Sequence, residues 1–299
     1  MTLSTLPAHD LSLLLVTPEQ VLEIFLVSIA AGIIGALFGL GGGILIIPFL
    51  TLVEGVPVQF AVGAGIVSVV ATSSASAATY VQDHLTNLRL GMFLETGTVA
   101  GALTGAYAAS YFQGPNEGVL FILFGAMLLY AATIMISQRR IDFPPGVKAD
   151  RLARTLRLGG QYKDQSSGTT VQYDVTRTPQ TLSISYLAGI VSGLLGVGGG
   201  FIKVPTMNLV SRIPVKVASA TSNFMIGVTA AASASVYFLR GEVHPLLAAP
   251  LMLGVVAGAA IGTRLLGRAP PTKVKVLFAI LLAFVAFNMI LRGLNVRIG

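Results

Sequence analysis

Residues 39–48 read GLGGGILIIP and place three consecutive glycines, Gly41 to Gly43, inside an apolar stretch. A glycine in the interior of a helix costs roughly 1 kcal/mol relative to alanine, so we do not expect a regular helix to run through all three. In a membrane, bare N–H and C=O groups must be buried in protein or line a cavity, because lipid offers them no partner. If the stretch lies in a membrane, it predicts a broken helix whose break faces other parts of the protein.

The composition places this stretch in a membrane. Of the 299 residues, 54% are hydrophobic and 10% are charged, and the mean hydropathy is +0.81, whereas soluble domains carry about 25% charged residues. Apolar runs such as 58–81 and 118–137 are long enough for a helix to cross a bilayer, which takes roughly 20 residues. They lack the alternating polarity of barrel strands. The sequence therefore predicts an all-α, multi-pass integral membrane protein.

Simple counts exclude several other classes. The start MTLSTLPAHD has no basic region and includes Asp10, so we expect no cleaved signal peptide. The chain has no cysteine, which excludes disulfides, thiolate metal ligands and thiol chemistry. The net charge of +7 comes mostly from Lys and Arg between apolar runs, where such residues orient membrane proteins. We therefore expect no nucleic-acid partner.

The glycine stretch recurs as GVGGGFIKVP at residues 196–205. Gly41 falls on Gly198, an offset of 157 residues, and the same offset aligns prolines and a tyrosine further along without a gap. Chance similarity of two Gly- and Ala-rich segments would not keep these residues in register. Repeats of this kind are common in secondary transporters. We expect about eight transmembrane helices in two homologous halves, each half with a helix broken at its GGG motif.

The repeat divides the chain into five segments. We expect an N-terminal segment at 1–20, a first transmembrane repeat at 21–137, a polar basic linker at 138–182, a second transmembrane repeat at 183–292 and a C-terminal tail at 293–299. The basic residues of the linker predict a cytoplasmic position by the positive-inside rule.

Two features leave the topology open. The loop 264–275 is also basic, and a simple count of eight spans would put it on the opposite side from the linker. The short apolar pieces 44–53 and 201–210 reach only about 15 Å, half of a bilayer core. They are either second arms of broken helices or re-entrant segments, and this choice decides between parallel and inverted repeats.

The glycine triplets suggest chemistry as well as shape. We expect 41–47 and 198–204 to be unwound, with a short helix restarting near the proline of each copy. Bare N–H groups and the positive end of a following helix would make an anion cradle without a charged side chain. The alternative is that the small residues only allow close helix packing. The helix-break residues are Gly39, Pro48, Gly196 and Pro205.

Lys203 stands where the first copy has Ile46, three residues after the second triplet. A cation within an apolar run is costly and marks a functional site, unless the ammonium extends to the membrane interface. Hydroxyl-rich faces in the third run of each half could bind an oxyanion or join two helices. The candidate substrate-binding residues are Gly41, Gly42, Gly43, Gly198, Gly199, Gly200, Lys203, Ser68, Thr72, Ser222 and Asn223, with Asn208 as a weaker candidate.

The remaining ionisable residues give little sign of catalysis. Glu23 and Glu95 lie near the ends of apolar runs and His84 and His244 in short loops, so we expect all four at the membrane interface. The sequence shows no nucleophile with a base, nucleotide loop or cluster of His and Asp for a metal. We expect no enzyme activity, cofactor or metal.

The two segments AGIIGALFGLGGGILIIP and AGIVSGLLGVGGGFIKVP resemble the sulfite exporter TauE/SafE family, and the resemblance covers about 20 to 292. It implies a bacterial inner-membrane protein of about eight helices that moves sulfite, sulfonates or other small organic anions with the proton gradient. The family pattern falls on Gly39, Gly41 to Gly43 and Pro48, and on Gly196, Gly198 to Gly200 and Pro205.

The expected function is a proton-coupled secondary transporter, an exporter of a small sulfur-containing or carboxylate anion held between the two glycine breaks. A passive anion channel, and a membrane sensor or scaffold that uses the basic linker, are the alternatives. The expected partners are the anion, protons as coupling ion and the lipid bilayer. The oligomeric state is left open, with a homodimer as one alternative.

Overall fold

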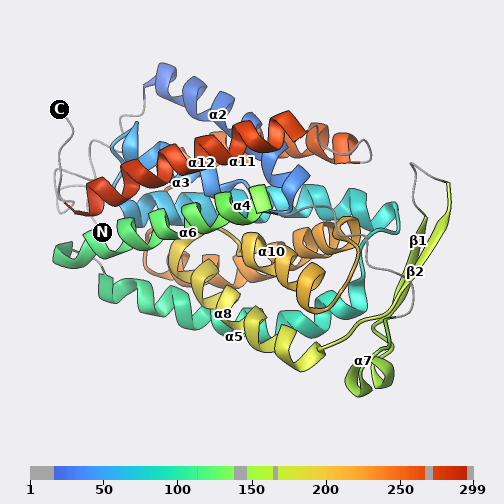
Figure 1. Ribbon diagram of the computed structural model, residues 1–299. Coiled ribbons are helices and arrows are strands. Elements are labelled where there is room, and N and C mark those ends of the chain that lie inside the picture. Colours follow the sequence, from blue (N-terminus) through green and yellow to red (C-terminus); the bar gives the residue numbers. More distant parts are fainter. Residues whose placement is uncertain (1–16, 113, 138–146, 164–167, 267–271, 295–299) are drawn as a thin grey trace.

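The computed structural model describes residues 17–112, 114–137, 147–163, 168–266 and 272–294. Eight helices in this part of the chain have 18 to 25 residues. They are α2 (Pro18–Phe38), α4 (Val58–Gln82), α5 (Leu88–Ala109), α6 (Glu117–Ser137), α8 (Thr178–Leu195), α10 (Val215–Leu239), α11 (Pro245–Leu266) and α12 (Thr272–Gly293) (Figure 1).

Shorter elements connect these helices. They are α3 (Gly43–Leu52), the 3-10 turns η2 (Ser110–Phe112) and η3 (Gly114–Asn116), α7 (Arg151–Thr155), the strands β1 (Gly160–Lys163) and β2 (Thr170–Tyr173), α9 (Gly200–Pro205) and the π-helical turn η4 (Thr206–Val210). The helices α2 and α8 begin at Pro18 and Thr178, earlier than the expected repeat boundaries at 21 and 183.

Six of the described helices are long and apolar enough to cross a membrane. They are Pro18–Phe38, Val58–Gln82, Glu117–Ser137, Val215–Leu239, Pro245–Arg264 and Val276–Gly293. The chain is an all-α, multi-pass membrane protein, and the two described strands lie outside these helices, in the linker.

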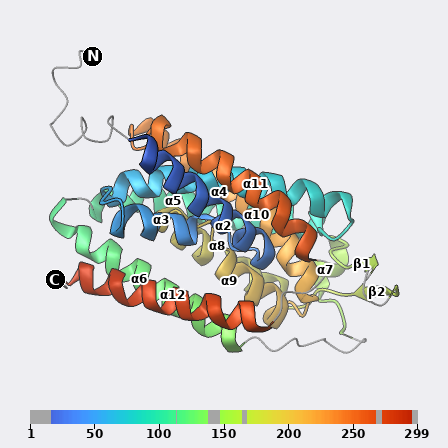
Figure 2. The same cartoon turned by 90° about the horizontal axis from the view of Figure 1, so that it is seen from above.

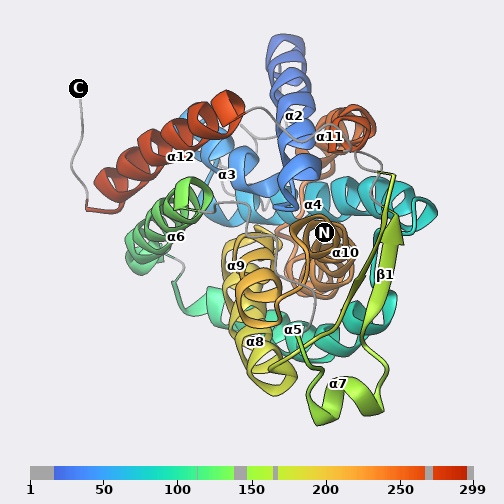
Figure 3. The ribbon, with the colours of Figure 1, turned by 45° about the vertical axis from the view of Figure 1, so that its right-hand side comes forward.

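The long helices pair across the two sequence halves. Helix α2 packs along α11, α5 packs along α8, and α6 lies beside α12, as Figure 3 shows for α6 and α12. Helices α4 and α10 cross at the centre of the bundle. The helices that follow or precede one another in sequence, such as α2 and α4, share far less surface.

Glycine faces allow these pairs to approach closely. A Cβ at Gly258 would lie 2.1 Å from the carbonyl oxygen of Ile29, and a Cβ at Gly101 would lie 2.1 Å from that of Tyr186. Small residues at helix contacts let membrane helices pack backbone against backbone. Any larger residue at Gly101 or Gly258 would push α5 from α8, or α11 from α2.

Helices α3 and α9 each turn back toward the end of the molecule from which the preceding helix came. The side-chain amide of Gln20, at the start of α2, donates to Glu54 just after α3 at 3.2 Å. In the second half, the hydroxyls of Thr181, near the start of α8, and Ser211, just after η4, lie 2.6 Å apart. Each pair is therefore a helical hairpin whose tip lies at the glycine break.

The two hairpins enter from opposite ends of the bundle. Helix α2 begins and α12 ends at one end, whereas α7, β1 and β2 lie at the other, where α8 begins (Figures 1 and 2). Gly254, Gly258 and Gly262 lie beside Phe25, Ile29 and Ile33 in the same order, so α11 runs parallel to α2 and ends at the linker end.

The described part of the linker is folded and docked. Strands β1 and β2 form an antiparallel hairpin in which Gly160 pairs with Tyr173. Leu158 and Val175 are buried in one cluster with Leu90 of α5 and Val217 of α10. The described part of the linker thus packs on α5 and α10 near the first residues of these helices.

Asp150 fixes the linker to the second half. Its carboxylate accepts hydrogen bonds from the backbone N–H of Ala153, in α7, and of Thr178, at the start of α8, both at 2.6 Å. Burial acts to raise the pKa of this carboxyl, but the hydrogen bonds from Ala153 and Thr178 outweigh it and leave the pKa below its usual range.

Candidate functional site

Each glycine triplet lies at a sharp break between two helices. Helix α2 ends at Phe38 and is capped by Gly39, whose φ of 66° is left-handed; α8 ends at Leu195 and is capped by Gly196, with a φ of 72°. Glycine adopts this conformation without the steric cost that other residues carry. Helix α3 begins at Gly43 and α9 at Gly200, so each break spans four residues.

The expectation that 41–47 and 198–204 are unwound, with helix restarting near proline, is wrong. Pro48 lies inside α3, and Pro205 is the last residue of α9, where a π-helical turn follows. A proline removes one backbone hydrogen bond, which local adjustment of a helix can absorb. The buried apolar residues that follow each triplet, such as Ile46 and Val204, favour continued helix despite that loss.

The two breaks touch each other. A Cβ at Gly43 would lie 2.8 Å from the carbonyl oxygen of Gly196, and a Cβ at Gly200 would lie 1.9 Å from that of Gly39. The methyl groups of Val69 and Ile226, on α4 and α10, contact Gly41 and Gly198 from both sides. In this conformation the triplets pack backbone against backbone, and the space between them is filled by Val69 and Ile226.

The triplets nevertheless carry unsatisfied donors. Within the described residues, the N–H groups of Gly41 to Gly43 and of Gly198 to Gly200 donate no hydrogen bond, and all six residues are buried. Buried N–H groups without partners are rare in proteins. These six donors are therefore without a hydrogen-bond partner in the described part of the chain.

Carbonyl groups at the ends of α2 and α8 are satisfied by long polar side chains. The hydroxyl of Tyr80 donates to the carbonyl of Ala36 at 3.0 Å, and the hydroxyl of Tyr237 donates to that of Gly193 at 2.8 Å. Tyr80 and Tyr237 are 157 residues apart, as are their acceptors. The two tyrosines hold equivalent helix ends in place.

Two predicted ligands, Ser222 and Asn223, lie at the first break. The hydroxyl of Ser222 donates to the carbonyl of Gly39 at 3.3 Å, and the amide of Asn223 donates to that of Ala36 at 3.3 Å. Their donors are thus engaged by the end of α2 and its cap. The Oδ1 atom of Asn223 has no hydrogen-bond partner among the described residues.

The other predicted polar ligands are bonded to backbone near them in sequence. Ser68 donates to the carbonyl of Gly65 at 2.6 Å and Thr72 to that of Ser68 at 2.8 Å, both within α4. Asn208 donates to the carbonyl of Ile213 at 2.9 Å and stabilises the turn after η4. Of these three, Thr72 is the one beside a triplet, since its hydroxyl lies 3.2 Å from where a Cβ of Gly42 would be.

Lys203 is buried at a central polar cluster. Its side chain is 1% exposed and its Nζ donates to the hydroxyl of Thr229, on α10, at 2.7 Å. That hydroxyl in turn lies 2.5 Å from Oε1 of Glu95, on α5, and 2.8 Å from the carbonyl of Met225. Lys203 therefore does not extend to an interface, and its role in substrate binding stays a prediction.

The expectation that Glu95 lies at the membrane interface is wrong. Its side chain is 6% exposed, and its Oε2 atom has no hydrogen-bond partner in the described part of the chain. Glu23 and His84, in contrast, are exposed, and His244 is half-buried with its ring edge against Phe60. The sequence feature that could have predicted the burial of Glu95 is its position, because it is the eighth residue of a 22-residue helix and not one of its first residues.

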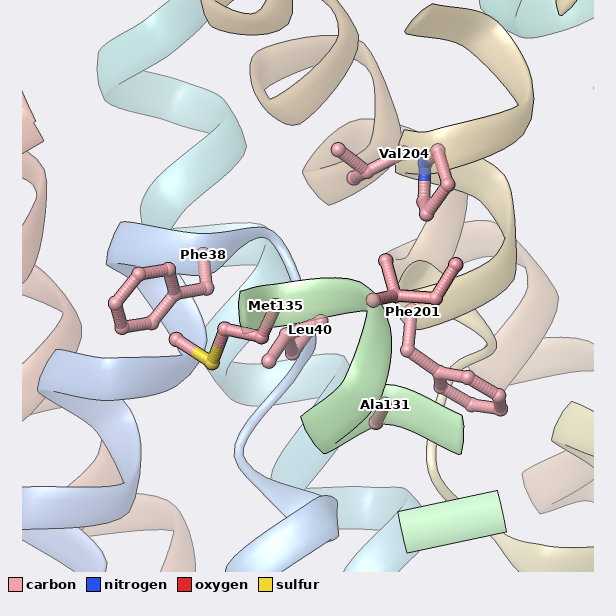
Figure 4. Close-up of a pocket in the computed structure, with 8 residues that line it drawn as sticks. Phe38, Leu40, Ala131, Met135, Phe201 and Val204 are labelled. Carbon is pink, nitrogen blue, oxygen red and sulfur yellow. The ribbon is translucent and has the colours of Figure 1, made fainter. Parts of the chain in front are cut away.

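A pocket lies beside the first break, between α2, α6 and α9 (Figure 4). Its lining residues are Phe38, Leu40, Ala131, Ile134, Met135, Phe201, Val204 and Pro205. All of these side chains are apolar, so the pocket suits an apolar group and not a charge. The described residues also contain no cluster of three or more His, Asp or Glu that could hold a metal.

Comparisons with known proteins agree with a transporter. The sequence profile of the family described as "Sulfite exporter TauE/SafE" matches residues 24–289. The "Probable membrane transporter protein YunE" of Bacillus subtilis is 27% identical over 271 residues, which cover 88% of this chain and 95% of that protein. No solved structure matches the chain.

Two further relatives extend the range of organisms. The "Probable membrane transporter protein MJ0441" of Methanocaldococcus jannaschii is 24% identical over 288 residues, which cover 90% of this chain and 94% of that protein. The "Sulfite exporter TauE/SafE family protein 6" of Arabidopsis thaliana is 36% identical over 90 residues, which cover 30% of this chain and 21% of that protein. The family and these relatives are named as transporters and not as enzymes. With its family profile matched over most of its length, the chain belongs to the sulfite exporter TauE/SafE family of membrane transporters.

Proposed function

We propose that the chain is a secondary carrier that binds a small oxyanion, such as sulfite or an organosulfonate, at Lys203 and Thr229 beside the glycine breaks. The observation that carries this proposal is the ammonium of Lys203, buried in the bundle with a hydroxyl as its hydrogen-bond partner. A charge at this depth is costly and is retained where it contacts a substrate or an ion. An oxyanion can accept hydrogen bonds from both an ammonium and a hydroxyl.

The glycine triplets would complete the site when the hairpin tips separate. Gly41 to Gly43 and Gly198 to Gly200 offer unpaired N–H groups at the starts of α3 and α9. N–H groups at helix starts favour anions. The closed contact between the tips, with Val69 and Ile226 between them, then corresponds to an occluded state in which these donors are covered.

We further propose that the two halves form an inverted repeat. The bounds Val58–Gln82 and Val215–Leu239 differ by 157 residues at both ends, as do Leu88–Ala109 and Pro245–Leu266. The hairpins of α2 with α3 and of α8 with α9 enter from opposite ends, which supports re-entrant segments related by an axis in the membrane plane. In this arrangement α2 and α8 are hairpin arms, although α2 is long enough to cross, and the six complete crossings are α4, α5, α6, α10, α11 and α12.

This topology removes the conflict between the two basic segments. Helix α11 runs parallel to α2 and ends at Leu266, at the same end of the bundle as the linker. Arg264, in the last turn of α11, therefore lies on the linker side, and we propose that both basic segments face the cytoplasm under the positive-inside rule. The proposed location is the inner membrane of a bacterium.

Alternating access would move mixed bundles and not the sequence halves. Gly101 and Gly258 bring α5 against α8 and α11 against α2 with backbone contact, and α4 packs on α11 as α10 packs on α5. Rocking one half against the other would break these contacts. We propose that the moving bodies are α2 with α4 and α11, and α5 with α8 and α10, and that they slide against each other where α4 crosses α10.

Anion exchange in proteoliposomes tests the proposal. Protein loaded with unlabelled sulfite or ethanesulfonate should take up the labelled anion from outside, and Lys203→Met should abolish this uptake. Lys216→Met, which removes a lysine near the start of α10, is the matched control and should retain it. Failure of the native protein to exchange sulfite, any sulfonate or a small carboxylate would refute a carrier. Single-channel currents would favour the channel.

A further inference from the structure

The polar cluster of Lys203, Thr229 and Glu95 holds two opposite charges joined by one hydroxyl. Thr229 has one hydroxyl proton, so while it accepts from Lys203 it donates either to Glu95 or to the carbonyl of Met225. One carboxylate oxygen of Glu95 remains without a partner among the described residues, although the side chain is more than nine-tenths buried. The carboxylate is therefore incompletely satisfied by the protein.

The cluster lies deep in the bundle. Thr229 is the fifteenth of the 25 residues of α10, about 21 Å from its first residue at 1.5 Å per residue. The N–H of Asn87, just before α5, donates to the hydroxyl of Thr221 at 3.0 Å, so the start of α5 is level with Thr221 and Glu95 is level with Thr229. Both ends of α10 are distant from the cluster.

Other ionisable groups lie on the elements packed around the cluster. On the described residues they are Glu19 and Glu23 of α2, Tyr80 of α4, Arg89 and Tyr107 of α5, Tyr111 of η2, Glu117 and Tyr130 of α6, Tyr186 of α8, Lys216 and Tyr237 of α10, and Tyr162 and Tyr173 of the hairpin. Glu19 and Glu23 are exposed and lie within the first six residues of α2. Arg89, Glu117 and Lys216 lie within the first two residues of their helices. Among the described residues of these elements, Lys203 is thus the charged side chain that lies as deep in the bundle as Glu95 does.

An incoming oxyanion would need the same donors that Glu95 now occupies. A second negative charge beside an ionised Glu95 would be repelled in a low dielectric. A protonated Glu95 would no longer compete for Lys203 and Thr229, and it could itself donate a hydrogen bond to the anion. We propose that Glu95 is the proton-binding residue of the carrier and that its protonation admits the anion to Lys203 and Thr229.

This inference rests on the proposed function and specifies its coupling. The empty cluster carries one positive and one negative charge. The loaded cluster, with a proton on Glu95 and a monoanion on Lys203, is also neutral. Either occupant alone would leave a net charge buried, which is strongly disfavoured. One proton therefore accompanies each monoanion in the same direction.

With this coupling, the proton gradient and the anion gradient together decide the direction of transport. Equal movement of proton and monoanion means that one pH unit balances a tenfold anion gradient. Export then occurs when the internal anion excess is larger than the pH gradient that opposes it. This differs from the expected export driven by the proton gradient, in which protons would move against the anion.

Binding to the native protein in detergent gives the first test. Ethanesulfonate is the probe because it does not titrate near neutral pH. Its binding enthalpy in buffers of different ionisation enthalpy should show one proton taken up per anion, and its affinity should rise tenfold for each pH unit lowered while Glu95 is ionised. Sulfite itself gains or loses a proton near neutral pH, so its binding affinity is compared between protein variants at a single pH. Binding without proton uptake by the native protein would overturn the inference.

Two glutamate variants sharpen the test. Glu95→Gln is nearly isosteric and permanently neutral, so it should bind and exchange the anion without proton uptake or pH dependence, and should lose accumulation driven by a pH gradient. Glu117→Gln, whose glutamate accepts from the N–H of Val58 at a helix end, should behave as the native protein. Proton uptake retained in Glu95→Gln would also overturn the inference.

The outcomes separate the two proposals. If the native protein exchanges none of these anions, the carrier itself is refuted. If it exchanges them with no proton movement, the carrier stands and the role of Glu95 falls. Because the native protein supplies the proton count, misfolding of Glu95→Gln would not remove the test.

Discussion

Replacing Gly200 by alanine should separate the two hairpin tips. The Cβ would lie 1.9 Å from the carbonyl oxygen of Gly39, whereas such carbon and oxygen atoms approach to about 3.3 Å. The tips must therefore move apart by more than about 1 Å at a contact where both partners are backbone atoms. Gly200 has an ordinary backbone conformation at the first residue of α9, so alanine itself is not strained there.

The cost follows from these contacts. Overpacking of a well-packed interior costs about 1–3 kcal/mol, and a contact with fixed backbone should reach the upper part of that range. The gain in helix propensity returns at most about 1 kcal/mol, so we expect a net destabilisation of about 2 kcal/mol and a fall in the unfolding temperature of several degrees. Gly227→Ala is the matched control, because its Cβ would meet a side-chain atom, the hydroxyl of Ser73, at the longer distance of 3.0 Å.

Thermal unfolding of the detergent-solubilised protein, followed by circular dichroism, measures the difference. The contact at Gly43 is less severe, 2.8 Å from the carbonyl oxygen of Gly196, so Gly43→Ala should fall between Gly200→Ala and Gly227→Ala. If Gly200→Ala unfolds at a temperature no lower than that of Gly227→Ala, the backbone contact between the tips is not the constraint described.

Three further predictions concern the helix end, the linker and the topology. Tyr237→Phe leaves the carbonyl at the end of α8 without its strongest donor and should cost about 1–3 kcal/mol in the same unfolding assay; an unchanged temperature would contradict this. The pKa of Asp150 is lowered from 3.8 by folding, so its stabilisation is present above that value and lost as pH falls below it. The protection factors of amides in β1 and β2, which are corrected for the intrinsic pH dependence of exchange, should therefore fall below about pH 4 in the native protein and should already be lowered at neutral pH in Asp150→Asn. Because the chain has no cysteine, Lys148→Cys and Arg264→Cys should react with an impermeant maleimide from one side of the membrane and Tyr111→Cys from the other. Labelling of Lys148→Cys and Arg264→Cys from opposite sides would rule out the proposed topology.

The sequence predicts the helical membrane part well because its signals are local. Long apolar runs and glycine triplets depend on residues near one another in the chain, and Lys203 could be identified as a deep cation from its neighbours alone. The place where the helices restart could not be predicted. Proline is favoured at helix starts, but burial of the residues around Pro48 outweighs that preference.

The partner of Lys203 was beyond sequence reasoning. Glu95 and Thr229 are 134 residues apart and meet because α5 packs on α10. Periodicity places Thr229 on a hydroxyl face, yet it does not say which neighbouring helix that face meets. The contact between the two triplets is of the same kind, since it follows from the crossing of two hairpins and not from either sequence alone.

The pairing of helices across the two halves also has a consequence for biosynthesis. The glycine face of α11 that packs on α2 is translated more than 200 residues after the start of α2, a delay of roughly 10 to 40 s at about 5–20 residues per second. During that interval, α2 is in the membrane without its principal partner. The amino-terminal half therefore reaches its final packing only after the ribosome has finished most of the chain, and neither half should fold when it is produced alone.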